Sequence, residues 1–95
     1  MYIRKPVDVI LQNNIDGSII PLKLRIRGED GEQYECKVTG YIDLSGQGAR
    51  TFADGVYVSN RNLVFKCKLL VEDKERIVNL YHIPSISAWF ITTGG

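Results

Sequence analysis

Apolar and polar residues alternate along most of the chain, which is the pattern of half-buried β-strands. The alternation is clearest over residues 19–27. One face of this segment carries Ile20, Leu22, Leu24 and Ile26, and the other carries Lys23, Arg25 and Arg27. Pro21 falls on the polar face near the start of the segment, so we expect a bulge or a missing partner strand there. No segment shows convincing helical spacing.

Short polar turns divide this pattern into six or seven antiparallel strands. The expected strands are 7–12, 19–27, 33–44, 56–59, 63–71, 77–83 and 86–92. They predict an all-β fold, a small closed barrel of the size of SH3 or oligonucleotide-binding barrels, because closure removes aggregation-prone edges. A two-sheet sandwich is the alternative. We expect one domain over residues 1–95, with flexible ends at 1–5 and 93–95 and a bulge at Gly40.

The turn over residues 28–32 predicts how the second and third strands pair. A type I turn at Glu29 and Asp30, followed by Gly31 in the left-handed region, gives a three-residue hairpin loop. The resulting register sets Ile26 opposite Tyr34, Leu24 opposite Cys36, Leu22 opposite Val38, Arg25 opposite Glu35 and Lys23 opposite Lys37. Apolar residues then face apolar residues, as a correct register requires.

Residues 45–55 form one long glycine-rich loop, and loops of this length are more often functional or mobile. After it, we expect a second hairpin in which 56–59 pairs with 63–71 around residues 60–61. This register sets Val58 opposite Leu63 and Val56 opposite Phe65. The segment 77–83 carries apolar residues on both faces, so its register cannot be derived from the pattern.

Composition sets the class of protein. The chain has 95 residues, 44% of them hydrophobic, and 12 Lys+Arg against 11 Asp+Glu give a formal net charge of +1. These values predict a globular domain and exclude whole-molecule attraction to nucleic acid or acidic membranes. We see no apolar run of membrane-spanning length and no signal peptide, so a cytoplasmic protein without membrane association is expected.

Few residues offer catalytic or metal chemistry. His82 is the only histidine and alternates within a strand, which favours a hydrogen-bonded structural role over a general base. Cys36 and Cys67 fall on core faces, which predicts buried free thiols. Zinc sites need about four Cys or His ligands, so we predict no metal, no cofactor and no enzyme activity.

A basic stripe is the main candidate site. The candidate anion-binding residues are Lys23, Arg25, Arg27, Lys37, Lys66 and Lys68. Only Arg25 has a carboxylate opposite it, and an anion such as a phosphate would relieve the opposed lysines of the first hairpin. If the two hairpins adjoin, Tyr41 or Tyr57 could supply a stacking platform for exposed bases.

Asp43, Ser45 and Gly48 fit the pattern Asp-x-Ser-x-x-Gly, and Arg50 follows two residues later. This stretch resembles the second half of the PilZ signature, which belongs to a family of small β-barrels that bind cyclic di-GMP. The resemblance implies that these four residues form a nucleotide loop. PilZ domains also carry an Arg-x-x-x-Arg element before the preceding strand pair, whereas residues 12–16 contain no arginine.

The terminal Gly94-Gly95 resembles the C-terminus of ubiquitin-like and sulfur-carrier proteins, which implies a carrier function. Those folds need a helix after the first hairpin, where residues 32–44 predict a strand. Our first hypothesis is a non-enzymatic binding or accessory module for another protein. Its candidate anchors are the aromatic residues Trp89, Phe90, Tyr57 and Tyr81. The alternative is nucleic-acid or nucleotide binding, which salt should weaken steeply.

Overall fold

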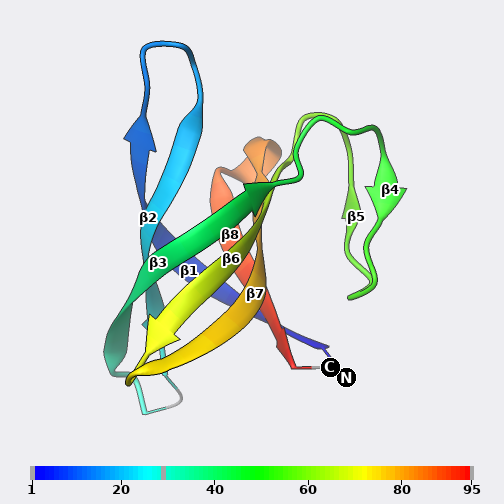
Figure 1. Cartoon of the computed structure of the whole chain (residues 1–95). Helices are drawn as coiled ribbons and strands as arrows, with labels where there is room; N and C mark the ends of the chain where they lie inside the picture. The colour runs from blue at the N-terminus through cyan, green and yellow to red at the C-terminus, as the bar shows by residue number, and fades with distance from the viewer. Residues whose placement is uncertain (1, 29, 95) are drawn as a thin grey trace.

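The computed structural model of the chain describes residues 2–28 and 30–94. Six strands close an antiparallel barrel in the order β1-β2-β3-β6-β7-β8, and β4 and β5 form a separate two-stranded hairpin (Figure 1). The elements are β1 (Tyr2–Asn13), β2 (Ile19–Arg27), β3 (Gln33–Asp43), β4 (Arg50–Thr51), β5 (Tyr57–Val58), β6 (Leu63–Val71), β7 (Lys74–Ile83), the 3-10 turn η1 (Pro84–Ile86) and β8 (Ala88–Gly94). The predicted small all-β barrel is confirmed, and the described part of the chain contains no helix able to span a membrane.

The register of β2 against β3 is as predicted for four of the five pairs. Lys23 lies opposite Lys37, and the ladder continues with Leu24–Cys36, Arg25–Glu35 and Ile26–Tyr34. The described residues of the turn match the expectation, because the Gly28 amide donates to the Glu32 carbonyl at 2.7 Å and Gly31 has a φ of +83°. Glu29 lies outside the described residues. The fifth expected pair, Leu22 with Val38, is not part of the ladder.

A bulge in β2 explains the missing pair. Ile10 lies opposite Lys23 but Leu11 lies opposite Pro21, so Leu22 is an extra residue without a partner in β1. An extra residue shifts the alternation by one position, so beyond the bulge the side chains expected to face inward face outward and the reverse. Pro21 is therefore fully buried, and Leu22 is 38% exposed. The prediction that Leu22 belongs to the core was wrong, whereas the bulge expected near Pro21 is confirmed.

A second bulge lies in β3 beside Gly40, as expected. Val38 pairs with Leu69 and Gly40 pairs with Lys68, which leaves Thr39 as the extra residue. The Thr39 hydroxyl donates to the Lys68 carbonyl at 3.4 Å and holds the bulge against β6. This bulge sets which residues of the second half of β3 reach the outer surface.

The two ends of the chain close the barrel. β1 pairs with β2 through its second half and with β8 through its first half, from Tyr2 opposite Gly94 to Val7 opposite Trp89. The segments 2–5 and 93–94, which we expected to be flexible, are thus paired strands, because closure needs both edges. Met1 and Gly95 lie outside the described residues.

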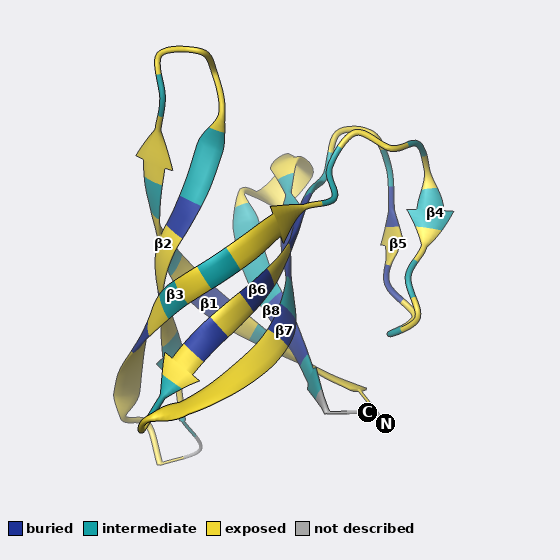
Figure 2. Ribbon diagram, viewed as in Figure 1, coloured by how far each residue is buried: buried dark blue, intermediate teal, exposed yellow. Residues whose placement is uncertain are grey.

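All six barrel strands contribute buried side chains to the interior, and β6 and β7 contribute the most (Figure 2). Leu24, Phe65, Leu69, Leu80 and Ile91 are at most 1% exposed, and the thiols of Cys36 and Cys67 are buried among them. Alternation over residues 63–71 predicts Leu63, Phe65, Cys67, Leu69 and Val71 as the inward face of β6, and all five lie in or against this core. Aromatic rings fill one end of the barrel, where Trp89 stacks on Phe65 with ring centroids 6.4 Å apart and lies tilted against His82 with centroids 4.6 Å apart.

The expected second hairpin does not form. β5 pairs with β4 instead of β6, with Val58 opposite Arg50, because β3 and β7 already occupy both edges of β6. The predicted long loop over 45–55 therefore contains a strand. The hairpin lies against the outer barrel wall (Figure 1), where Val56 and Val58 pack on Val64 and Tyr81. This second core explains why residues 77–83 carry apolar side chains on both faces.

The last strands begin at residues that differ from the prediction. Glu72 and Asp73 form the whole turn between β6 and β7, with φ of 48° and 65°, so β7 begins three residues earlier than expected, at Lys74. A two-residue turn with both φ positive matches the twist of the flanking strands. The 3-10 turn η1 delays β8 to Ala88.

Candidate functional site

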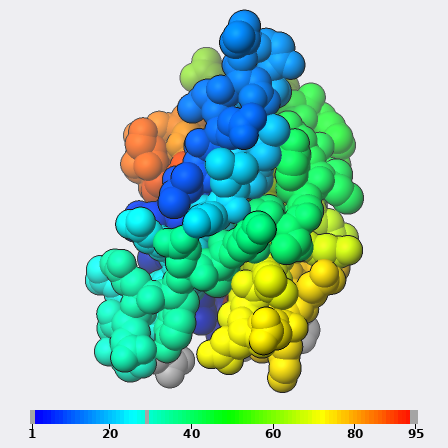
Figure 3. Space-filling model, turned by 60° about the vertical axis from the view of Figure 1, so that its left-hand side comes forward, coloured from blue at the N-terminus to red at the C-terminus, as the bar shows by residue number. Residues whose placement is uncertain are grey.

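The six basic residues singled out in the sequence lie on one continuous outer wall of the barrel. Lys23, Arg25 and Arg27 lie on β2, Lys37 on β3, and Lys66 and Lys68 on β6; all six are exposed. Because β3 pairs with both β2 and β6, the two groups of cations adjoin. Figure 3 is turned toward this side of the molecule, with β3 in green between β2 and the yellow end of β6.

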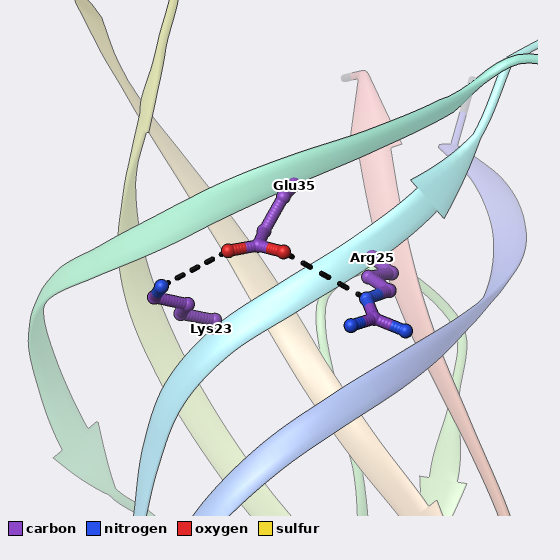
Figure 4. A network of polar contacts seen from close by, with 3 residues as sticks. All are labelled: Lys23, Arg25 and Glu35. Atoms are coloured by element: carbon purple, nitrogen blue, oxygen red, sulfur yellow. Dashed lines mark ion pairs between the residues drawn. The ribbon is translucent and has the colours of Figure 1, made fainter.

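Glu35 neutralises part of this wall (Figure 4). Its carboxylate lies 3.0 Å from the Lys23 ammonium and 3.8 Å from the Arg25 guanidinium. The hydrogen bond and charge of Lys23, with a smaller contribution from Arg25, lower the pKa of Glu35. Lys23 thus turns diagonally to a carboxylate, so the like-charge contact with Lys37 expected from the register is relieved within the protein.

A shallow pocket of about 250 Å³ opens beside the two arginines of β2. Its lining consists of Pro6, Val7, Asp8, Arg25, Arg27 and Gln33. Arg27 has no ion pair among residues 2–28 and 30–94. The carboxylate of Asp8 shares the pocket and offsets part of its positive charge.

A second groove, of about 240 Å³, crosses the outer face of β3, β6 and β7. We call it the docking groove, and its lining consists of Gly40, Tyr41, Ile42, Lys66, Cys67, Lys68 and Ile77. Gly40 forms an open floor, since a Cβ added there would meet nothing within 4 Å. Ile42 and Ile77 are 58% and 60% exposed, and neither lysine has an ion pair in the described part of the chain. The groove therefore combines exposed aliphatic surface with two unpaired cations.

Sequence reasoning found the lysines of the docking groove but not its aliphatic residues. Ile42 reaches the outer face because of the bulge at Thr39, and the register of the strand containing Ile77 could not be derived. The one sequence signal for the groove was Gly40, because a glycine within a strand often marks a bulge or a close approach of another group to the backbone.

The first residues of the motif loop are occupied by internal contacts. Asp43 accepts a hydrogen bond from the Ser45 amide at 2.9 Å. The Ser45 hydroxyl accepts from the Val64 amide at 2.8 Å and contacts the Val64 carbonyl at 3.3 Å. These contacts cap the end of β3 and tie the loop to the start of β6.

The later motif residues hold the β4–β5 hairpin in place. The Gly48 amide donates to the side chain of Asn60 at 2.8 Å, and Gly48 has a φ of +89°. The Arg50 guanidinium donates to the Leu44 carbonyl at 3.2 Å and lies over the Phe52 ring, 4.5 Å from its centroid. In this structure the residues that resemble a nucleotide loop therefore stabilise a turn and a hairpin.

The fold separates the motif loop from the cations of the first hairpin. Lys37 and Asp43 lie six positions apart on β3, which corresponds to roughly 20 Å at the rise of a strand. Lys66 is nearer to the loop, since it pairs with Ile42. The two sets of sequence-predicted site residues therefore form two surfaces, with the docking groove between them.

Asp54, which sequence reasoning missed, joins the hairpin to the barrel wall. Its carboxylate oxygen Oδ2 accepts hydrogen bonds from the Tyr81 hydroxyl at 2.6 Å, the Thr92 hydroxyl at 2.6 Å and the Asn79 amide at 3.2 Å. Burial raises the pKa of Asp54, but these bonds and one from the Val56 amide outweigh it and lower the pKa overall. Burial, together with Asp54, raises the pKa of Tyr81. Asp54 therefore acts as an anchor whose hydrogen-bonding capacity is already used.

The aromatic residues expected to anchor an interface differ in exposure. Tyr81 is fully buried under the hairpin, and Trp89 and Phe90 are half-buried. Phe90 stacks on Tyr81 with centroids 5.1 Å apart. Of the four, Tyr57 alone is largely exposed, at 65%. Tyr41, the other proposed stacking residue, packs edge-on against Phe65 and is 41% exposed.

The candidate reactive atoms are the Nδ1 of His82 and the two thiols, and all three are buried. The Nδ1 atom of His82 has no hydrogen-bond partner within the described residues, so the expected hydrogen bond to this atom is not seen. Burial raises the pKa of Cys67 to about 12 and also raises that of Cys36, which disfavours the reactive thiolate of each. Among residues 2–28 and 30–94, no group of three His, Cys, Asp or Glu side chains could hold a metal ion.

No protein-family model, curated protein sequence or solved structure matches the chain. The likeness to the PilZ signature is thus confined to Asp43–Arg50.

Proposed function

We propose that the protein is a non-enzymatic binding module that docks a segment of another protein in the docking groove. The observation that carries the proposal is the pairing of two exposed isoleucines with two lysines that have no ion pair in the described structure. Adjacent exposed apolar side chains with polar residues around them are typical of protein interaction sites, whereas single exposed apolar side chains are not. Tyr57, on the neighbouring hairpin, adds an exposed aromatic ring of the type enriched in binding hot spots.

The chemistry of the groove specifies the partner. An aliphatic side chain fits over Gly40, where the floor is open, in contact with Ile42 and Ile77. Carboxylates on either side of it would face Lys66 and Lys68. The expected ligand is thus an extended protein segment with a leucine or isoleucine between two acidic residues. Charge complementarity of this kind sets specificity and association rate more than affinity.

A peptide titration tests the proposal. The probes are a fluorescent decapeptide with a central leucine between glutamates, and the same peptide with glutamines in place of the glutamates. Lys66→Glu/Lys68→Glu should weaken binding of the acidic peptide at least about tenfold through charge reversal. The matched control, Lys23→Glu/Lys37→Glu, makes the same charge change on the same wall and should leave binding within about twofold. Circular dichroism checks that both variants fold.

If both double variants lost the same amount of peptide affinity, the cause would be the net charge of the protein, and the proposal would be contradicted. So would equal binding of the acidic and glutamine peptides, or saturable binding of neither. The combined variant Ile42→Ser/Ile77→Ser provides an independent check, because it removes the aliphatic surface and leaves both lysines in place. The proposal expects this variant to lose binding as well.

A second candidate function, binding of a nucleotide or nucleic acid, is favoured by the pocket beside Arg25 and Arg27. A phosphate there would face two guanidinium groups, which bind phosphate in a bidentate manner. Titration with cyclic di-GMP and short single-stranded oligonucleotides should then show binding that falls steeply with salt. Loss of that binding in Arg25→Gln/Arg27→Gln, but not in Lys66→Gln/Lys68→Gln, would support this candidate over the first.

We also propose a cytoplasmic setting. Cys36 and Cys67 are both free thiols within the barrel. Free cysteines are the normal state of proteins in a reducing compartment.

A further inference from the structure

The two ends of the barrel are filled differently. Trp89, Phe65 and His82 pack together at one end. The other end holds a pocket of about 210 Å³, whose floor is formed by the buried side chains of Cys36, Leu69, Val78 and Ile91. The pocket opens to the outside above these four side chains, which are themselves at most 6% exposed. Mouths of β-barrels are common positions for small-molecule sites.

Two cations occupy core-face positions at this mouth. Lys5 lies opposite the buried Ile91, and Arg76 lies opposite the buried Leu69. Strand alternation would place apolar residues at both positions, yet Lys5 and Arg76 line the pocket instead. Neither has an ion pair in the described structure, and no carboxylate lines the pocket.

Acidic residues lie in the two turns near this mouth. Tyr34 lines the pocket from β3, and the nearby charges of Asp30 and Glu72 raise the pKa of its hydroxyl. Both acidic residues belong to turns, outside the pocket lining. The lining of the pocket is therefore cationic at Lys5 and Arg76, and the acidic residues that influence Tyr34 lie outside it.

We propose that this mouth binds a small amphipathic anion, with its apolar part in the barrel and its acid group on Lys5 and Arg76. Sites for drug-sized ligands have volumes of roughly 300–1,000 Å³, so this pocket suits a smaller molecule, such as a medium-chain or aromatic carboxylate. The site is independent of the docking groove, which lies on the outer wall. Failure of one proposal leaves the other intact.

The test is an NMR titration of ¹⁵N-labelled protein with octanoate. Octylamine and butyrate are titrated in the same way for comparison. The proposal expects saturable octanoate binding with a dissociation constant of about 0.1–1 mM, seen as shifts at Cys36, Leu69 and Ile91. Butyrate should bind at least roughly tenfold more weakly, because each buried methylene contributes several-fold in affinity. Octylamine, which carries the opposite charge, should not cause these shifts.

Two variants of equal charge change separate the rim from the rest of the protein. Lys5→Gln/Arg76→Gln should weaken octanoate binding roughly fivefold or more, and Lys66→Gln/Lys68→Gln should leave it unchanged. The amide spectrum of each variant shows whether the barrel is intact. The proposal is overturned by equal affinity for octanoate and octylamine, by independence from chain length, or by absence of saturable shifts at the mouth.

Discussion

Replacing Asp54 by alanine should release the β4–β5 hairpin from the barrel wall. One oxygen of this carboxylate accepts hydrogen bonds from Tyr81, Thr92 and Asn79, which belong to β7 and β8. Alanine would remove all three bonds and leave the Tyr81 hydroxyl beneath the hairpin without its 2.6 Å partner. The apolar contact of Val56 with the wall would remain.

The magnitude follows from the two short bonds. A hydrogen bond to a charged group contributes about 1.5–3 kcal/mol to stability. The two bonds from the Tyr81 and Thr92 hydroxyls together would therefore contribute roughly 3–6 kcal/mol to the free energy of unfolding. Asp54 is only half-buried, and water can replace part of the lost interaction, so we expect a loss of about 3 kcal/mol. A chain of 95 residues has a total stability of roughly 5–14 kcal/mol, so the loss is a substantial part of it.

Urea unfolding, followed by circular dichroism and by Trp89 fluorescence, measures the loss. Asp16→Ala is the matched control, because Asp16 accepts hydrogen bonds from the amide and hydroxyl of Ser18 in an exposed turn that touches no other element. It should cost much less. Amide exchange at Phe52, which bonds the Val56 carbonyl at 2.9 Å, should accelerate selectively in Asp54→Ala. Equal loss of stability in the two variants would refute the anchoring argument.

Three further predictions concern pH, thiol reactivity and backbone conformation. The folded-state pKa of Asp54 lies below 3.8, so the stability that Asp54 contributes is present above that pH and is lost as pH falls through the folded-state pKa. Urea titrations should therefore show that the difference in unfolding free energy between wild type and Asp54→Ala becomes smaller in acid. A difference that does not change with pH would contradict this prediction. Cys67, with a pKa of about 12, should react with iodoacetamide only after unfolding, and rapid labelling of native protein would show that the core is open. Gly31→Ala should lower the free energy of unfolding by about 1 kcal/mol, because Gly31 has a φ of +83°. Gly40→Ala should lower it by less in the same urea assay, because a Cβ at this position would meet nothing within 4 Å.

Local patterns predicted the parts of the fold that depend on local chemistry. The Gly28–Glu32 turn fixed the register of β2 and β3, and alternation identified the inward face of β6. Alternation failed at Leu22, because one extra residue exchanges the faces of a strand and leaves no clear mark in composition. It also failed for the segment 56–59, whose apolar residues fit a strand in the barrel as well as a hairpin outside it.

The candidate site was predictable only in part, for the same reasons. Charged residues on exposed faces are visible in the sequence, so Lys66 and Lys68 could be found. Which residues lie beside them depends on strand order and on the bulge at Thr39, and both are set by contacts distant along the chain. The exposure of Ile77 could not be foreseen, because the second core buries only part of the outer face of β7.

The most direct test of protein docking is to map the acidic peptide onto ¹⁵N-labelled protein by amide shifts. The account predicts that the largest shifts cluster at Gly40, Ile42 and Ile77 and disappear in Lys66→Glu/Lys68→Glu. Shifts centred instead on Arg25 and Arg27, or a spectrum unchanged by the peptide, would contradict the claim that this face of the barrel binds a partner.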